Sequence, residues 1–352
     1  MNKLILGLLL FILTYILMIV VPKYRAHVAL TSAAFFVILG LLPFEDVLPA
    51  IDFNVLMMIA GTMGIVALFI ESKMPSLLAD VIIDRMPSMK WVVFALSVFA
   101  GLISAFVDNV ATVLMVAPVA ITVSKKLGLS PVKMVIAISI ASNLQGAATL
   151  VGDTTSILLG GYAGMSFADF YFYQGKLGLF FIVQIAMVMA TLVLYIYFRK
   201  ENQPVHLTEK TEVTDYLPTI LLVGTILSLI VASFIPNTPA LINGYICMGF
   251  LLLGFMIQSM RYGFKKTMNT IMKEMDFFTL SLLAGLFVVI AGISEVGVID
   301  AIRHLFLKVG SGNIFLLYTL IVFASVIFSA FIDNIPYVAT MLPVVTGIAA
   351  SM

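Results

Sequence analysis

The stretch Ser104-Ala105-Phe106-Val107-Asp108-Asn109 recurs, with one conservative change, as Ser329-Ala330-Phe331-Ile332-Asp333-Asn334. Each copy carries its Asp-Asn pair between two apolar runs. The runs are residues 91–107 and 110–124 around the first pair, and residues 313–331 and 334–349 around the second. Apolar runs of this length predict helices, so each copy predicts a helical hairpin with the polar pair at its tip.

The repetition extends upstream of the hairpins. Residues 51–71 align without gaps on residues 275–295 at an offset of 224 residues (295 − 71), with identities that include Asp52/Asp276 and Glu71/Glu295. The hairpin motifs follow at an offset of 225 (333 − 108). Matches at nearly constant spacing indicate an internal repeat.

The composition predicts an all-α integral membrane protein. Of the 352 residues, 62% are hydrophobic and 11% are charged, and the mean hydropathy is +1.16. No water-soluble domain of this size could carry that balance on its surface. Helices are predicted at residues 4–21, 27–42, 55–70, 91–107, 110–124, 133–163 with an interruption, 177–198, 216–235, 240–259, 277–293, 313–331 and 334–349.

Several classes of function are excluded by what the chain lacks. A single cysteine and three scattered histidines give neither a disulfide framework nor the spacing of a metal cage. A net charge of +1 does not suit binding to nucleic acid. No nucleophile–base pair is apparent at membrane depth, so the chain is predicted not to be an enzyme.

A polar stretch divides the chain into two halves. Residues 199–215 are predicted to be a cytoplasmic linker between a first half, 1–198, and a second half, 216–352. With the linker in the cytoplasm, 15 of the 19 lysines and arginines lie on its side of the membrane. This bias requires the two repeats to have inverted topologies, each with a re-entrant hairpin.

Asp108 and Asp333 are the strongest candidates for function. A carboxylate deep in a membrane is unfavourable by a few kcal/mol or more unless it meets a cation, a proton or helix N-termini. A purely structural role is the alternative, in which Asp108 or Asn109 only caps the second arm. Recurrence of the pair favours function, because a simple turn could use glycine or serine.

A second polar feature, residues 143–156, interrupts the apolar segment 133–163. Gly146 and Gly152 permit non-helical backbone, so freed carbonyls could coordinate a cation and the next half-helix could offer amides to an anion. Small residues could instead serve only helix packing. The partner of this feature in the second repeat would begin near residue 368 (143 + 225), beyond Met352. We therefore expect the second broken helix to be absent, and the chain to be a fragment rather than a naturally truncated protein.

The sequence resembles the ion transporter superfamily over nearly the whole chain. The most specific matches are the hairpin motifs, residues 146–156 and residues 329–343. The branch is that of the arsenite and sodium/proton antiporter-like permeases and the P protein, related to citrate transporters and divalent anion/sodium symporters. In the related symporters a Ser-Asn-Thr motif at each tip coordinates sodium and substrate; here Asp108-Asn109-Val110 and Asp333-Asn334-Ile335 occupy those places. The added aspartates favour proton or cation coupling over tight binding of a multiply charged anion.

The resemblance implies a multi-pass transporter of a bacterial or archaeal plasma membrane, a homodimer in the lipid bilayer. We expect secondary active transport of a small inorganic or organic ion, with Na⁺ or H⁺ as the coupling ion and no other cofactor. Transport of arsenite, sodium/proton exchange and transport of citrate-like carboxylates all stay open. The alternative class of protein is a channel or a structural membrane subunit. The candidate ion- or substrate-binding residues are Asp108, Asn109, Thr112, Asn143, Gly146, Thr149, Gly152, Asp153, Thr154, Asp333, Asn334 and Thr340, with Na⁺ predicted at Asp108, Asn109 and Asp153.

Overall fold

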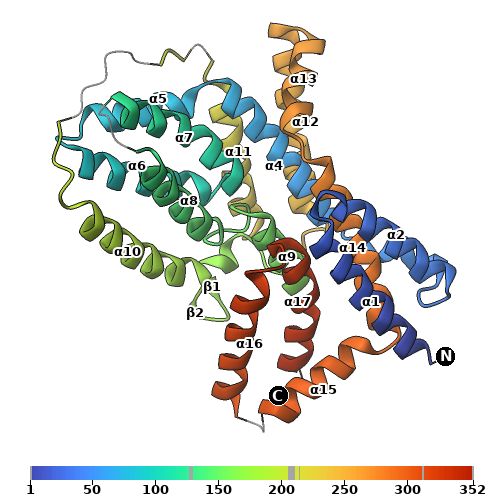
Figure 1. Ribbon diagram of the computed structural model, residues 1–352. Coiled ribbons are helices and arrows are strands. Elements are labelled where there is room, and N and C mark those ends of the chain that lie inside the picture. Colours follow the sequence, from blue (N-terminus) through green and yellow to red (C-terminus); the bar gives the residue numbers. More distant parts are fainter. Residues whose placement is uncertain (1, 127–129, 205–210, 214, 311–312, 351–352) are drawn as a thin grey trace. The chain divides into compact units, whose positions relative to one another are not determined.

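The computed structural model describes residues 2–126, 130–204, 211–213, 215–310 and 313–350 (Figure 1). These residues form α-helices joined by short loops, which confirms the predicted all-α fold. The helices are α1 Lys3–Val20, α2 Arg25–Ile38, α3 Val47–Ala50, α4 Phe53–Glu71, α5 Met74–Asp84, α6 Met89–Ser104, α7 Asn109–Lys126, α8 Val132–Gly146, α9 Thr154–Ala163, α10 Leu179–Phe198, α11 Leu217–Ala232, α12 Ile242–Tyr262, α13 Phe264–Glu274, α14 Phe277–Glu295, α15 Val298–Gly310, α16 Ile314–Ser329 and α17 Asn334–Ala350.

The remaining regular elements are small. They are three turns of 3₁₀ helix and a two-stranded antiparallel β-hairpin: η1 Pro22–Tyr24, η2 Phe44–Asp46, η3 Ala168–Phe170, β1 Phe172–Tyr173 and β2 Lys176–Leu177. Gln174 and Gly175 connect the strands with positive φ angles of 51° and 75°. Such a pair of angles is what a tight two-residue hairpin turn requires.

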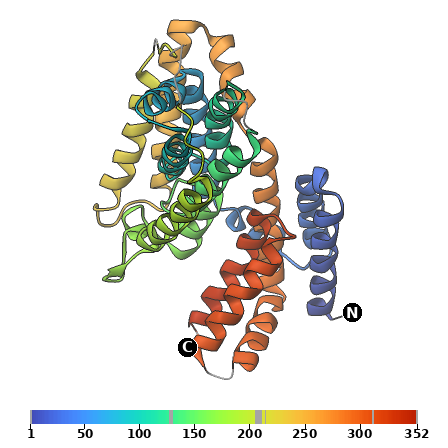
Figure 2. The ribbon, with the colours of Figure 1, turned by 60° about the vertical axis from the view of Figure 1, so that its left-hand side comes forward.

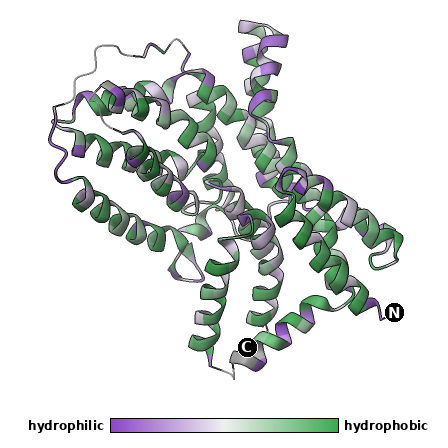
Figure 3. Cartoon of the chain, viewed as in Figure 1, coloured by the Kyte–Doolittle hydropathy of each residue, from purple (hydrophilic) through white to green (hydrophobic). Residues whose placement is uncertain are grey.

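In the described part of the chain, five helices are long and apolar enough to cross a membrane: α1, α4, α10, α12 and α14. The hairpin helices, α8 and α11 are also apolar, over shorter stretches. Figure 3 shows hydrophobic residues along these helices, whereas hydrophilic residues gather on α13 and along α15. The multi-span character predicted from composition is confirmed.

Each predicted span is present, with ends that differ by a few residues. The sequence analysis missed α5, α13 and α15. These three helices have 11 to 13 residues, and α13 and α15 carry charges at helical spacing, so a search for long apolar runs passes over them.

Contacts divide the chain into two compact units that interleave in sequence. Unit 1 comprises Met1–Leu56, Gly161–Ala163 and Asp276–Met352. Unit 2 comprises Met57–Gly160 and Gly164–Met275. The first hairpin (α6–α7) and the interrupted segment α8–α9 as far as Gly160 belong to unit 2, and the second hairpin (α16–α17) belongs to unit 1.

Unit 1 is organised around α14, which packs against α2 at close range. A methyl group added at Gly285 would come within 2.8 Å of the backbone at Ala29, and one added at Gly292 within 2.4 Å of the Phe36 ring. Helix α1 joins this pair through a buried hydrogen bond between the hydroxyls of Thr14 and Ser32. Helices α16 and α17 lie side by side as an antiparallel pair (Figures 1 and 2).

Unit 2 has a continuous apolar core to which most of its helices contribute, including α4, α6, α7, α8, α11 and α12. Within this core α6, α7 and α8 pack on one another. Helices α4 and α12 approach so closely that a methyl group at Gly61 would lie 2.6 Å from the backbone of Cys247. The core therefore holds the first hairpin against α8 on a rigid support.

Both repeats build the same local structures. Asp52 accepts a hydrogen bond from the backbone N–H of Val55 at the start of α4, and Asp276 accepts one from Thr279 at the start of α14, at 3.0 Å in each case. A short helix and a hairpin then follow in each repeat. Helices α7 and α17 each contain an internal proline, Pro118 and Pro343. The internal repeat read from the sequence therefore extends to helix caps and helix interruptions.

Candidate ion-binding site

The tip of the first hairpin is built around Asp108. Its Oδ1 accepts hydrogen bonds from the backbone N–H groups of Val110 at 3.0 Å and Ala111 at 3.1 Å, so the side chain caps α7. The structural role considered from the sequence is thus present. It does not exclude an ionic role, because a carboxylate at a helix N-terminus keeps lone pairs for a second partner.

The predicted interruption of the segment 133–163 is also present. Helix α8 ends at Gly146 and α9 starts at Thr154, with no regular helix between them. Asp153 begins α9: its Oδ1 accepts from the Thr154 N–H at 2.8 Å, and its Oδ2 accepts from the Thr155 hydroxyl at 2.7 Å. The first repeat therefore places an aspartate at the start of two half-helices, α7 and α9.

Direct hydrogen bonds join the hairpin tip to the interrupted helix. The Asn109 side-chain amide donates to the side-chain oxygen of Asn143. The Ser142 hydroxyl lies 3.1 Å from the Asn109 carbonyl oxygen and 3.0 Å from the Ser104 hydroxyl. The Thr149 hydroxyl donates to the carbonyl of Ala105. Of the residues predicted for the site, Asn109 and Asn143 are thus in direct contact.

Gly152 lies where the interrupted helix closely approaches the tip of the first hairpin. A Cβ atom at Gly152 would lie 2.5 Å from the Gly146 carbonyl oxygen and 2.8 Å from those of Ser104 and Ala105. Real Cβ atoms do not approach backbone oxygen this closely, so only glycine fits. Three carbonyl oxygens therefore converge at one buried point of the interrupted helix.

The remaining candidates of the first repeat line the helix starts. Thr112 is fully buried, and its hydroxyl donates to the Val107 carbonyl at 3.4 Å. Thr154 is 7% exposed. Asp108, Asn109 and Asp153 are half-buried, which leaves part of each side chain accessible.

This arrangement is rich in oxygen ligands and backbone amides. Carboxylate, amide, hydroxyl and carbonyl oxygens suit a hard cation such as Na⁺, and the starts of α7 and α9 favour negative charge. Among the residues that the structure describes, no three His, Cys, Asp or Glu side chains gather in a way that could hold a metal ion.

The second hairpin repeats the tip with a different partner. Asp333 Oδ1 accepts from the Ile335 N–H at 3.3 Å, while its Oδ2 lies 2.6 Å from Arg25 Nη1. Asn334 accepts from the Ser329 hydroxyl at 2.7 Å. Arg25 is not among the site residues predicted from the sequence. No local signal could reveal the pair, because 308 residues separate its members.

Thr340 is held by a residue that the sequence analysis also missed. The Tyr15 hydroxyl of α1 donates to the Pro336 carbonyl at 2.7 Å and is hydrogen-bonded to the Thr340 hydroxyl. In the first repeat, Ser104 and Ser142 are further missed members of the site. Ser104 belongs to the repeated motif itself, which was the available signal.

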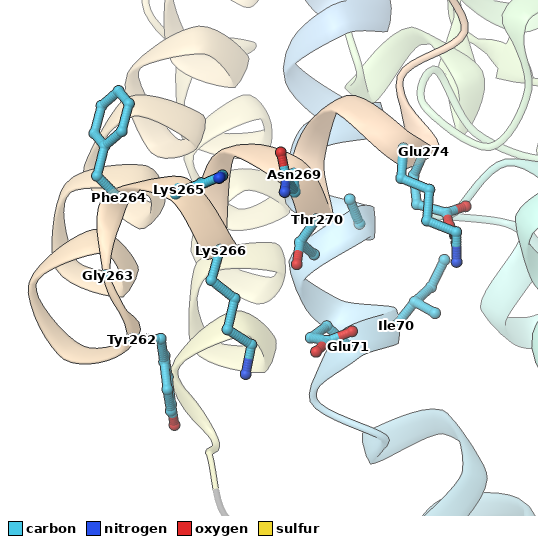
Figure 4. A pocket seen from close by; sticks show the side chains of 12 residues that line it. Ile70, Glu71, Tyr262, Gly263, Phe264, Lys265, Lys266, Asn269, Thr270 and Glu274 are labelled. Atoms are coloured by element: carbon cyan, nitrogen blue, oxygen red, sulfur yellow. Dashed lines mark ion pairs between the residues drawn. The ribbon is translucent and has the colours of Figure 1, made fainter.

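A separate pocket of about 770 Å³ lies in unit 2 at the end of α4 and beside α13 (Figure 4). Glu71 and Lys266 extend into it from facing elements, and Lys273 and Glu274 form a long ion pair of 3.9 Å on its wall. None of the candidate residues lines this pocket. The pocket also carries mixed charges on exposed side chains, so it is not assigned to the candidate site.

Comparison with known proteins connects this architecture to transport. The family model described as "Citrate transporter" (CitMHS) matches residues 15–352. The "Uncharacterized transporter MT2759" of Mycobacterium tuberculosis is 30% identical over 335 residues, which cover 93% of this chain and 77% of the relative. The "46 kDa membrane protein" of Mycobacterium leprae is 30% identical over 354 residues, 97% of this chain and 80% of the relative.

A more distant match falls in an animal protein. The mouse "P protein" is 34% identical over 133 residues, which cover 37% of this chain and 16% of that protein. These matches agree with the resemblance drawn from the hairpin motifs. They also confirm that the chain is a multi-pass membrane transporter with bacterial relatives and not an enzyme. The chain belongs to the citrate transporter family.

Proposed function

We propose that the protein is a secondary active transporter of a small ion, coupled to Na⁺ or H⁺. The observation that carries the proposal is the hydrogen-bonded junction between the first hairpin tip and the interrupted helix, where Asn109 contacts Asn143. A capping aspartate stands at the start of each adjoining half-helix. Irregular backbone of this kind inside an apolar unit is tolerated where it lines an ion pathway.

In this proposal the carboxylates of Asp108 and Asp153 and the side-chain oxygen of Asn109 hold the coupling cation. Asn143 and Thr149 fix the junction, and Gly146 and Gly152 permit its backbone. Thr112 and Thr154 shape the helix starts. Asp333, Asn334 and Thr340 form an equivalent site of their own in the second repeat. The two repeats have inverted topology, 199–215 is a cytoplasmic linker, and the working unit is a homodimer.

Citrate, a tricarboxylate, or a dicarboxylate is the second candidate substrate, because the matched family model is described as a citrate transporter. Two features weigh against tight binding of a free multiply charged anion at the first tip. Both Asp108 and Asp153 are acidic, and like charges repel at short range. Transport of a citrate–cation complex, or coupling to several cations, removes this charge repulsion. The repulsion does not arise for arsenite transport or for sodium/proton exchange.

The test is uptake into proteoliposomes that hold the purified full-length protein. Counter-flow is measured with labelled citrate, with arsenite and with ²²Na⁺, each with and without an imposed Na⁺ or pH gradient. The proposal predicts saturable uptake of one substrate class that follows an imposed gradient. Uptake that rises linearly with concentration and ignores both gradients indicates a channel and contradicts the proposal.

A further inference from the structure

Arg25 reaches the tip of the second hairpin from the start of α2. Its Nη1 lies 2.6 Å from Asp333 Oδ2, and its Nε donates to the Met18 carbonyl at 3.0 Å. The guanidinium is therefore held by one hydrogen bond to α1 while it pairs with the carboxylate. All of these residues belong to unit 1.

The ion pair is partly shielded from solvent. The side-chain exposures are 20% for Arg25 and 37% for Asp333. A planar guanidinium that stays charged at any physiological pH is a strong partner for a carboxylate in such surroundings. Arg25 thus supplies an opposite charge directly at the Asp333 carboxylate.

A second contact keeps the tip in place beside α1. The Tyr15 hydroxyl donates to the Pro336 carbonyl and bonds the Thr340 hydroxyl, one turn further along α17. The Tyr337 hydroxyl donates to Ser325 at 2.7 Å within the hairpin. Tyr15 and Tyr337 thus hold the first turns of α17, and Arg25 is the charged partner of Asp333.

We propose that Arg25 is a positioning residue that acts as a built-in counter-ion and competes with the coupling cation for the Asp333 carboxylate. This inference rests on the proposed function, in which Asp333 binds the coupling cation at the second hairpin. A cation that takes the position beside Oδ2 replaces the guanidinium there. The pair therefore lowers the apparent cation affinity of the second hairpin and allows release.

The decisive variant is Arg25→Gln, with Lys23→Gln as the matched control. Lys23 is an exposed cation two residues away whose ammonium lies 5.9 Å from the Tyr24 ring centroid. Arg25→Gln should lower the half-saturating Na⁺ concentration of uptake by about tenfold, because it removes a charge-assisted partner that competes for the carboxylate. If H⁺ is the coupling ion, the pH dependence of uptake should change instead. Lys23→Gln should change neither.

An unchanged cation dependence in Arg25→Gln, together with loss of uptake in Asp333→Asn, overturns the inference and leaves the proposed function standing. Wild-type uptake and coupling in Asp333→Asn contradict the proposed role of Asp333 itself. Should Arg25→Gln fail to insert, Arg25→Gln/Asp333→Asn provides the second measurement. The double variant should regain insertion and thermal stability in detergent, and its failure to do so also overturns the inference.

Discussion

Gly152 offers the sharpest structural test of the junction between the first hairpin and the interrupted helix. Replacement by alanine adds one methyl group at a point where three backbone oxygens lie 2.5 to 2.8 Å away. Backbone atoms cannot rotate aside as a flexible side chain can, so the hairpin tip and residues 146–152 must separate. We expect destabilisation by about 3 kcal/mol, the upper end of the usual overpacking range.

The measurement is thermal unfolding of the purified protein in detergent, together with uptake in proteoliposomes. The matched control is Gly249→Ala on α12, an exposed helical glycine around which nothing lies within 4 Å of an added Cβ. Alanine there should be neutral or stabilising by about 0.5–1 kcal/mol, because glycine is unfavourable in a helix. Wild-type stability and uptake in Gly152→Ala would refute the close packing on which the site is built.

Two further predictions concern buried polar contacts in unit 2. Ser142→Ala removes the hydroxyl that bridges Ser104 and the Asn109 carbonyl, and it should destabilise the protein by about 1–2 kcal/mol and reduce uptake. The control is Ser97→Ala, at a buried hydroxyl with no hydrogen-bond partner, which should be neutral or stabilising. Equal effects of the two substitutions would contradict the bridge. Gln184→Leu leaves the reciprocal amide partner Gln145 unsatisfied and should destabilise by about 1–3 kcal/mol. Gln145→Leu/Gln184→Leu should be less destabilised than the sum of the single changes in the same unfolding assay, and strict additivity would count against the pair.

Much of the fold follows from local composition. Long apolar runs define the spans, because a helix that crosses the hydrocarbon core of a membrane needs apolar side chains along its length. The Asp-Asn pairs define the hairpin tips because a polar pair ends an apolar helix and caps the next one. The glycine-rich stretch 143–156 predicted an interruption, and the structure has one at Ala147–Asp153. Each of these signals lies within a short stretch of sequence, so it can be recognised without knowledge of the tertiary structure.

The parts that escaped prediction depend on contacts between distant segments. Arg25 and Asp333 meet across 308 residues, and neither sequence neighbourhood points to the other. Tyr15 and Thr340 meet across 325 residues. Helix α13 was missed for a different reason: its 11 residues combine three lysines and a glutamate with a few apolar side chains, which is typical of a surface helix and not of a span.

Asp108→Asn tests the central claim most directly. The substitution is isosteric, and the asparagine oxygen can still accept the amides of Val110 and Ala111, so the cap of α7 survives while the charge is removed. Gradient-driven uptake is measured in proteoliposomes at matched protein content, with Asp46→Asn, an exposed carboxylate outside both hairpins, as the control. The account predicts normal membrane insertion and loss of ion-coupled flux for Asp108→Asn alone. Uptake and coupling equal to wild type would contradict it.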